Sequence, residues 1–277
     1  MGRLEGKVAF ITGAARGQGR SHAVRFAEAG ADIIAIDICT QIDTVEYPMA
    51  TESDLADTTK LVEDLGRCIV AGPADVRDRA SMEKILTQGI SQFGRLDFVV
   101  ANAGIMPVYG DASETMQAWH DCLDVLLTGV LNTVELTYPV LVEQGSGGSI
   151  VITSSMAALT PMMRTRKGHR LGVLGYSAAK AALMNLARNY ASILAADYIR
   201  VNTVHPTGVN TPMINNSLME RYFAESDPQD LLTLTNAIPV PVVEDHDISD
   251  AVLWLCSPES RYVTGTALPI DAGATLR

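Results

Sequence analysis

Short, unbroken apolar runs alternate along the chain with longer stretches whose apolar residues recur every three or four positions. Runs of the first kind are typical of buried parallel strands, and stretches of the second kind are typical of helices. Strands are expected at residues 8–11, 33–36, 67–71, 97–101 and 149–155, with a sixth ending before residue 207. Helices are expected at residues 21–29, 56–65, 79–93 and 114–143. This alternation predicts an α/β fold, a Rossmann-type doubly wound parallel sheet in a single domain over 1–277.

A glycine-rich turn links the first expected strand to the helix that follows it. Gly13, Gly17 and Gly19 have the spacing G-x-x-x-G-x-G. Glycines in such a turn let the backbone approach a phosphate closely, and the helix N-terminus adds unpaired N–H groups and partial positive charge. A turn of this kind can be purely structural, but its place between a strand and a helix favours nucleotide binding.

Asp37 ends the second expected strand, close to the spacing of about 20 residues after the glycine turn that is typical of a ribose-binding acid. A carboxylate there accepts bonds from ribose hydroxyls and repels a 2′-phosphate, so NAD is favoured over NADP. Arg16, inside the glycine turn, is a weaker signal in the opposite direction, because a cation attracts a phosphate. An aspartate that only caps a turn is the structural alternative.

Polar or small residues fall at the ends of several expected strands and just after them: Gly13, Asp37, Asp75, Asn102 and Ser155. Ligands of open α/β sheets bind along this edge, so these residues are expected to line one site. An inserted loop at about 38–60 follows the second strand and lacks a clean period. Connections of this length are usually functional or mobile.

Tyr176 and Lys180 lie four residues apart in an alanine-rich stretch that is expected to be helical. Residues at this spacing share a helix face, so the phenol and the ammonium point the same way. A cation beside a phenol favours the phenolate and lowers the pKa, which would make Tyr176 a general acid or base near neutral pH. Taken alone, such a pair is more often surface decoration on a helix.

Composition narrows the range of partners. The 21 Lys and Arg against 32 Asp and Glu leave a net charge of −11, which argues against nucleic acid and anionic membranes. No run approaches the 18 apolar residues of a membrane span, and no secretory segment is seen, so the protein is expected in the cytoplasm. The four cysteines lie far apart, so neither a metal site nor a disulfide is expected. Four histidines without ligand spacing are expected at the surface: His22, His120, His169 and His246.

Together these residues resemble the short-chain dehydrogenases/reductases over nearly the whole chain. The resemblance rests on the glycine turn with Thr12, Asn102-Ala103-Gly104, Ser155, Tyr176-x-x-x-Lys180, Arg200-Val201-Asn202, His205-Pro206 and Tyr262-Val263-Thr264-Gly265. It implies that Tyr176 exchanges a proton with the substrate oxygen, and that Ser155, rather than Ser154, orients that oxygen. It also implies that Lys180 binds the nicotinamide ribose and lowers the pKa of Tyr176.

The same resemblance implies NAD as cofactor and assigns its binding residues. Asp75 and Val76 would hold the adenine, and Val209 and Thr211 the nicotinamide end. The full set implied is Gly13, Arg16, Gly17, Gln18, Gly19, Asp37, Asp75, Val76, Asn102, Ala103, Gly104, Tyr176, Lys180, Val209 and Thr211. No metal is expected.

The inserted loop, with residues 205–213, resembles a narrower group, the mycofactocin-coupled, carveol-dehydrogenase-like members. This implies a tightly held NAD that is recycled in place by a separate redox carrier of the mycofactocin type. A homotetramer is also implied by the family resemblance.

The chain departs from the family pattern in three places. Leu126 stands where the family commonly has an asparagine of a proton relay, and Thr207 stands where glycine is frequent. The interval between Ser155 and Tyr176 is longer than usual and holds a basic loop at 164–170. An exposed or subunit-contact segment is favoured for this loop over a binding site for an acidic substrate or partner.

Residues 207–240 carry apolar side chains without a sheet pattern. They form either a lid over an apolar substrate or a segment packed on the body or on a neighbouring subunit.

The predicted function is therefore an NAD-dependent oxidoreductase that interconverts an apolar secondary alcohol, of terpenoid or sterol-like type, and its ketone. One alternative is an NADPH-dependent reductase of 3-oxoacyl thioesters, which Asp37 argues against. The other is a non-catalytic dinucleotide-binding sensor, which Leu126 alone supports.

Overall fold

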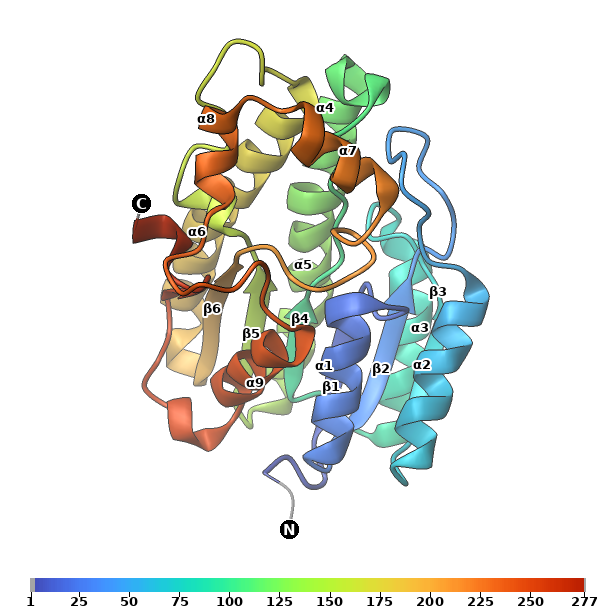
Figure 1. Cartoon of the computed structure of the whole chain (residues 1–277). Helices are drawn as coiled ribbons and strands as arrows, with labels where there is room; N and C mark the ends of the chain where they lie inside the picture. Colours follow the sequence, from blue (N-terminus) through green and yellow to red (C-terminus); the bar gives the residue numbers. More distant parts are fainter. Residues whose placement is uncertain (1–2, 277) are drawn as a thin grey trace.

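A sheet of seven parallel strands forms the centre of the molecule (Figure 1). The computed structural model describes residues 3–276, without the side chain of residue 233. The strand order is β3-β2-β1-β4-β5-β6-β7. Strands β1 to β3 are therefore added in one direction across the sheet, and β4 to β7 are added in the other direction, starting on the far side of β1. The strands are β1 Val8–Thr12, β2 Asp32–Asp37, β3 Ile69–Pro73, β4 Phe98–Ala101, β5 Gly148–Thr153, β6 Ile199–Pro206 and β7 Ala267–Ile270. The predicted fold class is confirmed.

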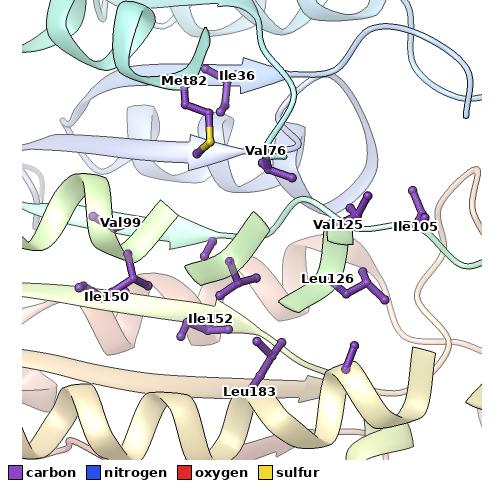
Figure 2. Packing of buried hydrophobic residues seen from close by; sticks show 14 of the residues in the cluster. Ile36, Val76, Met82, Val99, Ile105, Val125, Leu126, Ile150, Ile152 and Leu183 are labelled. Atoms are coloured by element: carbon purple, nitrogen blue, oxygen red, sulfur yellow. The ribbon is translucent and has the colours of Figure 1, made fainter. Parts of the chain in front are cut away.

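Helices cover both faces of the sheet (Figure 1). They are α1 Gly17–Glu28, α2 Glu52–Asp64, α3 Arg79–Phe93, α4 Met116–Leu123, α5 Gly129–Gln144, α6 Leu171–Leu194, α7 Ser217–Glu225, α8 Pro228–Leu231 and α9 Asp245–Cys256. Strand side chains alternate between two cores, one beneath α1 and α9 and the other beneath α3, α5 and α6. In the second core, Ile150 and Ile152 of β5 lie among residues such as Val99 and Leu183 (Figure 2). Burial on both faces explains why the strands are unbroken apolar runs.

The inserted loop is shorter than predicted. Helix α2 begins at Glu52, so the irregular segment after β2 is 38–51 rather than 38–60. Thr51 is the N-cap: its side chain accepts from the Asp54 N–H, and the Asp54 carboxylate accepts from the Thr51 N–H. This capping box satisfies two N–H groups that the start of a helix leaves unpaired.

Pro139 lies inside α5 and does not end that helix. Because proline lacks an N–H, the carbonyl oxygen of Glu135 loses its helical partner. Arg79 donates to that oxygen at 3.4 Å and replaces part of the lost bond. The predicted helix is instead divided at Asp124–Thr128, which forms a π-helical turn between α4 and α5.

The segment Met116–Gln144, which includes this turn, is by length and composition apolar enough to cross a membrane. However, 44% of its most apolar window is buried inside the protein, where α5 packs against β4, β5 and α3. A helix of this kind is also typical of a buried protein core.

Candidate active site

A cavity of about 710 Å³ lies at the carboxyl ends of the strands. Every residue that the sequence predicted for the site lines it, from the glycine turn after β1 to Thr211 after β6. These residues come together because parallel strands all end at the same edge, and the reversal of strand order opens a crevice there. Segment 38–51 and helix α7 also contribute to the wall.

The glycine turn is held in a shape that only glycine permits. Gly13 has a φ of 69°, and a Cβ there would lie 2.7 Å from the Cα of Ala103. A Cβ on Gly19 would lie 1.9 Å from the carbonyl oxygen of Gly13. The start of α1 therefore packs directly on the turn, and its first residues Gly17, Gln18 and Gly19 line the cavity. A helix N-terminus in this position suits an anion.

Asp37 closes the adjacent side of this turn. Its side chain is buried, Oδ2 accepts from the Ala15 N–H at 3.0 Å, and Oδ1 accepts from the Cys39 N–H at 3.3 Å. Burial raises its pKa, and the two backbone bonds oppose this. Each carboxylate oxygen keeps a lone pair for a further donor, as two neighbouring hydroxyls of a ribose would supply.

Ser155, Tyr176 and Lys180 meet at the centre of the cavity. Ser155 follows β5, and the other two lie one turn apart on α6. The hydroxyl of Ser155 bonds the phenol of Tyr176, whereas Ser154 donates to the carbonyl oxygen of Lys180 at 2.8 Å. The two neighbouring serines therefore have different partners within the protein.

The electrostatics of Tyr176 differ from the expectation. Burial raises its pKa, and the bond from Ser155 only partly offsets this. The Lys180 ammonium lies 5.8 Å from the centre of the Tyr176 ring and donates to the carbonyl oxygen of Thr153 at 2.6 Å. Burial also lowers the pKa of Lys180, to about 8. The predicted lowering of the Tyr176 pKa by Lys180 is therefore wrong for these side chains by themselves, because burial is the largest effect on the phenol and the effect that opposes it comes from Ser155.

Leu126 makes the wall beside Lys180 apolar. It belongs to the π-helical turn, is fully buried and lines the cavity. A Cβ on Gly104 would lie 3.2 Å from Leu126 Cδ2 and 3.8 Å from Lys180 Nζ, so the two side chains flank this glycine. Leucine offers no polar atom to the lysine, which is consistent with the strong desolvation of the ammonium.

Two buried groups support the site from behind. His205 directs Nδ1 to the carbonyl oxygen of Ser155 at 3.0 Å, and Nε2 lies 2.7 Å from the Thr203 hydroxyl. Thr207, the second departure from the family pattern, donates to Oδ1 of Asn236 at 2.9 Å. The threonine thereby ties the end of β6 to a distant loop, a contact that glycine could not make.

His22 is fully buried, so its predicted place at the surface is wrong. Its Nδ1 lies 2.8 Å from the hydroxyl of Ser249, which donates to the carbonyl oxygen of Asp245. Ser249 also lies 2.7 Å from the Ser21 hydroxyl, so the donor between His22 and Ser249 depends on the histidine tautomer. His22 Nε2 has no hydrogen-bond partner among residues 3–276. Burial lowers its pKa to about 3, against a small opposing effect of Asn102. Spacing alone could not reveal this, because α9 brings Ser249 from the other end of the chain.

Burial of His22 is expected to make the folded protein less stable in acid. With a pKa lowered from 6.5 to about 3, His22 binds fewer protons folded than unfolded, so stability falls as the pH drops through that interval. His22→Asn retains an N–H donor near Ser249 but does not titrate. Between pH 7 and pH 3, wild type should lose about 4 kcal/mol more free energy of unfolding than the variant. Urea unfolding at each pH measures this, and equal losses in both proteins would contradict the burial of a neutral His22.

Segment 38–51, which sequence reasoning left without specific contacts, bridges the cavity from β2 to the connection between β4 and α4. Tyr47 accepts from the Met106 N–H at 3.1 Å, and the Glu46 carboxylate accepts from the Ala112 N–H at 3.0 Å. Thr44 donates to Asp121 at 2.5 Å, with both side chains buried. The segment lies near the strand ends, beside β3 and α2 (Figure 1). It is thus a strap fastened at both sides of the cavity.

Helices α7 and α8 lie above the strand ends (Figure 1). Apolar residues of this region line the cavity: Met213, Ile214, Met219, Tyr222 and Phe223. The ring of Tyr222 lies 5.1 Å from that of Tyr109, which follows β4. Part of the predicted lid 207–240 therefore faces the cavity.

The basic loop at 164–170 lies outside the cavity lining. Arg166, Lys167 and His169 are exposed, and Asp230 of α8 accepts from the N–H groups of Arg164 and Thr165. These contacts agree with an exposed segment rather than with a binding site for an acidic substrate.

A family model described as enoyl-(acyl carrier protein) reductase matches residues 13–275. An uncharacterized oxidoreductase of Mycobacterium tuberculosis is 55% identical, covering 98% of this chain and 96% of its own. The (-)-trans-carveol dehydrogenase of Rhodococcus erythropolis is 44% identical over the whole of both chains. The crystal structure of carveol dehydrogenase from Mycobacterium avium in complex with NAD is 45% identical, with a TM-score of 0.91 and complete coverage of both chains.

Proposed function

Because this chain belongs to the short-chain dehydrogenase/reductase family, we propose that it is an NAD-dependent oxidoreductase that interconverts an apolar secondary alcohol and its ketone. The observation that carries the proposal is the meeting of Ser155, Tyr176 and Lys180 in one cavity, between the glycine turn and a largely apolar wall. The relatives named for carveol support the substrate class, and the relative crystallised with NAD supports the cofactor.

The residues present fit a dinucleotide. The glycine turn has no room for a Cβ at Gly13 or Gly19, and the Asp37 carboxylate keeps lone pairs free. The buried Oε1 of Gln18 has no partner among residues 3–276, although Gln18 lines the cavity. The turn would hold the pyrophosphate, Asp37 the adenosine ribose and Lys180 the nicotinamide ribose. When bound, NAD supplies the hydride acceptor of alcohol oxidation.

Tyr176 moves the proton of the reaction at its phenolic oxygen. Burial favours the neutral phenol, which is the form that donates a proton to a carbonyl oxygen during ketone reduction. Alcohol oxidation needs the phenolate, which burial disfavours and which the hydrogen bond from Ser155 partly restores. The single hydroxyl proton of Ser155 is directed to Tyr176. With substrate bound, Ser155 would donate this proton to the substrate oxygen instead and so orient the carbon for hydride transfer.

An uncharged substrate is favoured by the charges of the wall. The charged residues of the lining are Arg16, Asp37, Asp75, Lys180 and Glu220. The first three belong to the dinucleotide side, and Asp75 is paired with Arg77. Apart from Lys180, and from Arg16 on the dinucleotide side, the described residues of the lining include no cation for the phosphate of an acyl-carrier thioester. Together with Asp37, which repels a 2′-phosphate, this argues against the NADPH-dependent thioester reductase.

The strap at 38–51 supports a tightly held NAD, recycled in place by an external carrier such as mycofactocin. It is held by buried hydrogen bonds of Thr44 and Tyr47. A dinucleotide bound beneath it would leave only when these bonds break. A homotetramer in the cytoplasm completes the proposal, on the family resemblance alone.

Loosening the strap is expected to speed the loss of NAD. Tyr47→Phe leaves the buried Met106 N–H without its acceptor, which costs about 1–3 kcal/mol and favours opening of the strap by roughly 5–150-fold. The release of NAD after dilution, followed by its fluorescence when reduced, measures this. Tyr198→Phe, on a residue that is 84% exposed, is the control. Equal release rates for all three proteins would remove the strap from NAD retention.

The function itself is tested on the protein as purified. Mass spectrometry of co-purifying small molecules should find NAD. Turnover of carveol with an artificial electron acceptor should then be seen without added NAD. Bound NAD with no turnover of any secondary alcohol would favour the dinucleotide-binding sensor that Leu126 supports. Tighter binding of NADPH than of NADH would favour the thioester reductase.

A further inference from the structure

Methionine is heavily represented in the cavity wall. The chain has eleven methionines, and six of them line the cavity: Met49, Met106, Met156, Met162, Met213 and Met219. They arrive from four segments that are separate in the sequence, the strap and the connections that follow β4, β5 and β6. No single helix or strand therefore explains their number as part of its own apolar face.

The six methionine side chains are packed into the cavity wall rather than projecting from it into solvent. Met106, Met156 and Met219 are buried, and the other three are half-buried. The sulfur of Met106 lies 3.8 Å from the Tyr109 hydroxyl, and the ring of Tyr109 contacts that of Tyr222. The phenols of this part of the cavity thus have protein partners of their own: Tyr47 accepts from Met106, and Tyr222 bonds Ser226.

The chemistry of methionine gives such a wall an unusual property. Its unbranched side chain has three rotatable bonds and a polarizable sulfur, so it can fill spaces of different shape at low cost. A branched side chain of similar volume has fewer low-energy shapes and defines a cavity more rigidly. The same surface made of leucine would hold one shape well and exclude others.

Building on the proposed function, we propose that these methionines are specificity-determining residues. They form an adaptable wall through which one active site accepts uncharged secondary alcohols of several shapes. A substrate is then selected because it is uncharged and because its hydroxyl can reach Tyr176 and Ser155. The shape of its carbon skeleton has only a weak effect.

The test compares wild type with the triple variant Met106→Leu/Met213→Leu/Met219→Leu on three probes: linear 2-octanol, monocyclic carveol and bicyclic borneol. Leucine keeps the volume and apolar character, so folding and NAD binding should be retained. For wild type, kcat/KM should stay within about tenfold across the probes, because no rigid contact selects one skeleton. In the variant, the ratio of best to worst probe should widen by at least about tenfold, because misfit by a methylene costs roughly 10–200-fold.

Met82→Leu is the matched control, since Met82 is fully buried in the core beneath α3 and does not line the cavity. It should leave the ratio unchanged. Thermal unfolding and NAD content of each protein separate lost shape tolerance from lost folding. A single preferred skeleton in wild type, or an unchanged ratio in the triple variant, would overturn the inference alone. Absence of turnover with all three probes would overturn the proposed function, and the inference with it.

Discussion

Tyr176→Phe is expected to lower turnover of a secondary alcohol at least about 100-fold while NAD remains bound. The substitution keeps the ring that packs in the cavity wall and removes only the oxygen that exchanges a proton with the substrate. Ser155 loses one hydrogen-bond partner, a small effect beside the loss of the acid or base. Steady-state rates with carveol, together with the NAD content of the purified variant, measure the two effects separately.

Tyr190→Phe is a close control for this experiment. Tyr190 lies on the same helix and is 7% exposed, against 8% for Tyr176, but it bonds Glu135 and does not line the cavity. Its loss should leave turnover unchanged within a small factor. A Tyr176→Phe protein with near-normal rates would remove Tyr176 from the chemistry and with it the proposed mechanism.

Asp37→Ala is expected to shrink the preference for NAD over NADP by about 100-fold or more. Loss of a charged acceptor for ribose hydroxyls weakens NAD by roughly 1.5–3 kcal/mol. Loss of the negative charge at the same time relieves the repulsion of a 2′-phosphate. Arg16, whose charge acts on Asp37, then becomes the dominant charge near this position.

Titration of both dinucleotides into the apoprotein measures the discrimination directly. Asp32→Ala provides the comparison, because Asp32 lies at the opposite end of the same strand and pairs with Arg67. That variant should discriminate as wild type does. If Asp37→Ala discriminates equally well, the carboxylate has no part in ribose recognition and the assignment of NAD rests on the relatives alone.

The elements that were predicted well are those with a local physical cause. Strands buried on both faces must be apolar throughout, so β1, β2, β4 and β5 were visible as short runs. Strand β7, which is only partly buried and contains Pro269, has no such run and received no prediction. The glycine turn was recognisable because backbone crowding at Gly13 and Gly19 leaves no other residue type that fits.

The extent to which each polar side chain is buried could not be predicted from local sequence patterns. The sequence placed Lys180 beside Tyr176 correctly, but the sign of the Tyr176 pKa shift depends on how much water the surrounding elements remove. His22 was misplaced for the same reason, because its partner Ser249 lies on α9. Likewise, the bonds that fasten the strap join residues far apart in the chain, and the methionine wall is assembled from four segments.

The sequence by itself therefore determined the fold class, six of the strands, the family and the candidate chemical groups of the site, because each depends on residues close together or on the shared edge of parallel strands. Only the tertiary structure decided how far those groups are removed from water and which side chains line the cavity around them. These properties arise when separate segments pack against one another, and desolvation and shape are properties of that packing rather than of any one segment.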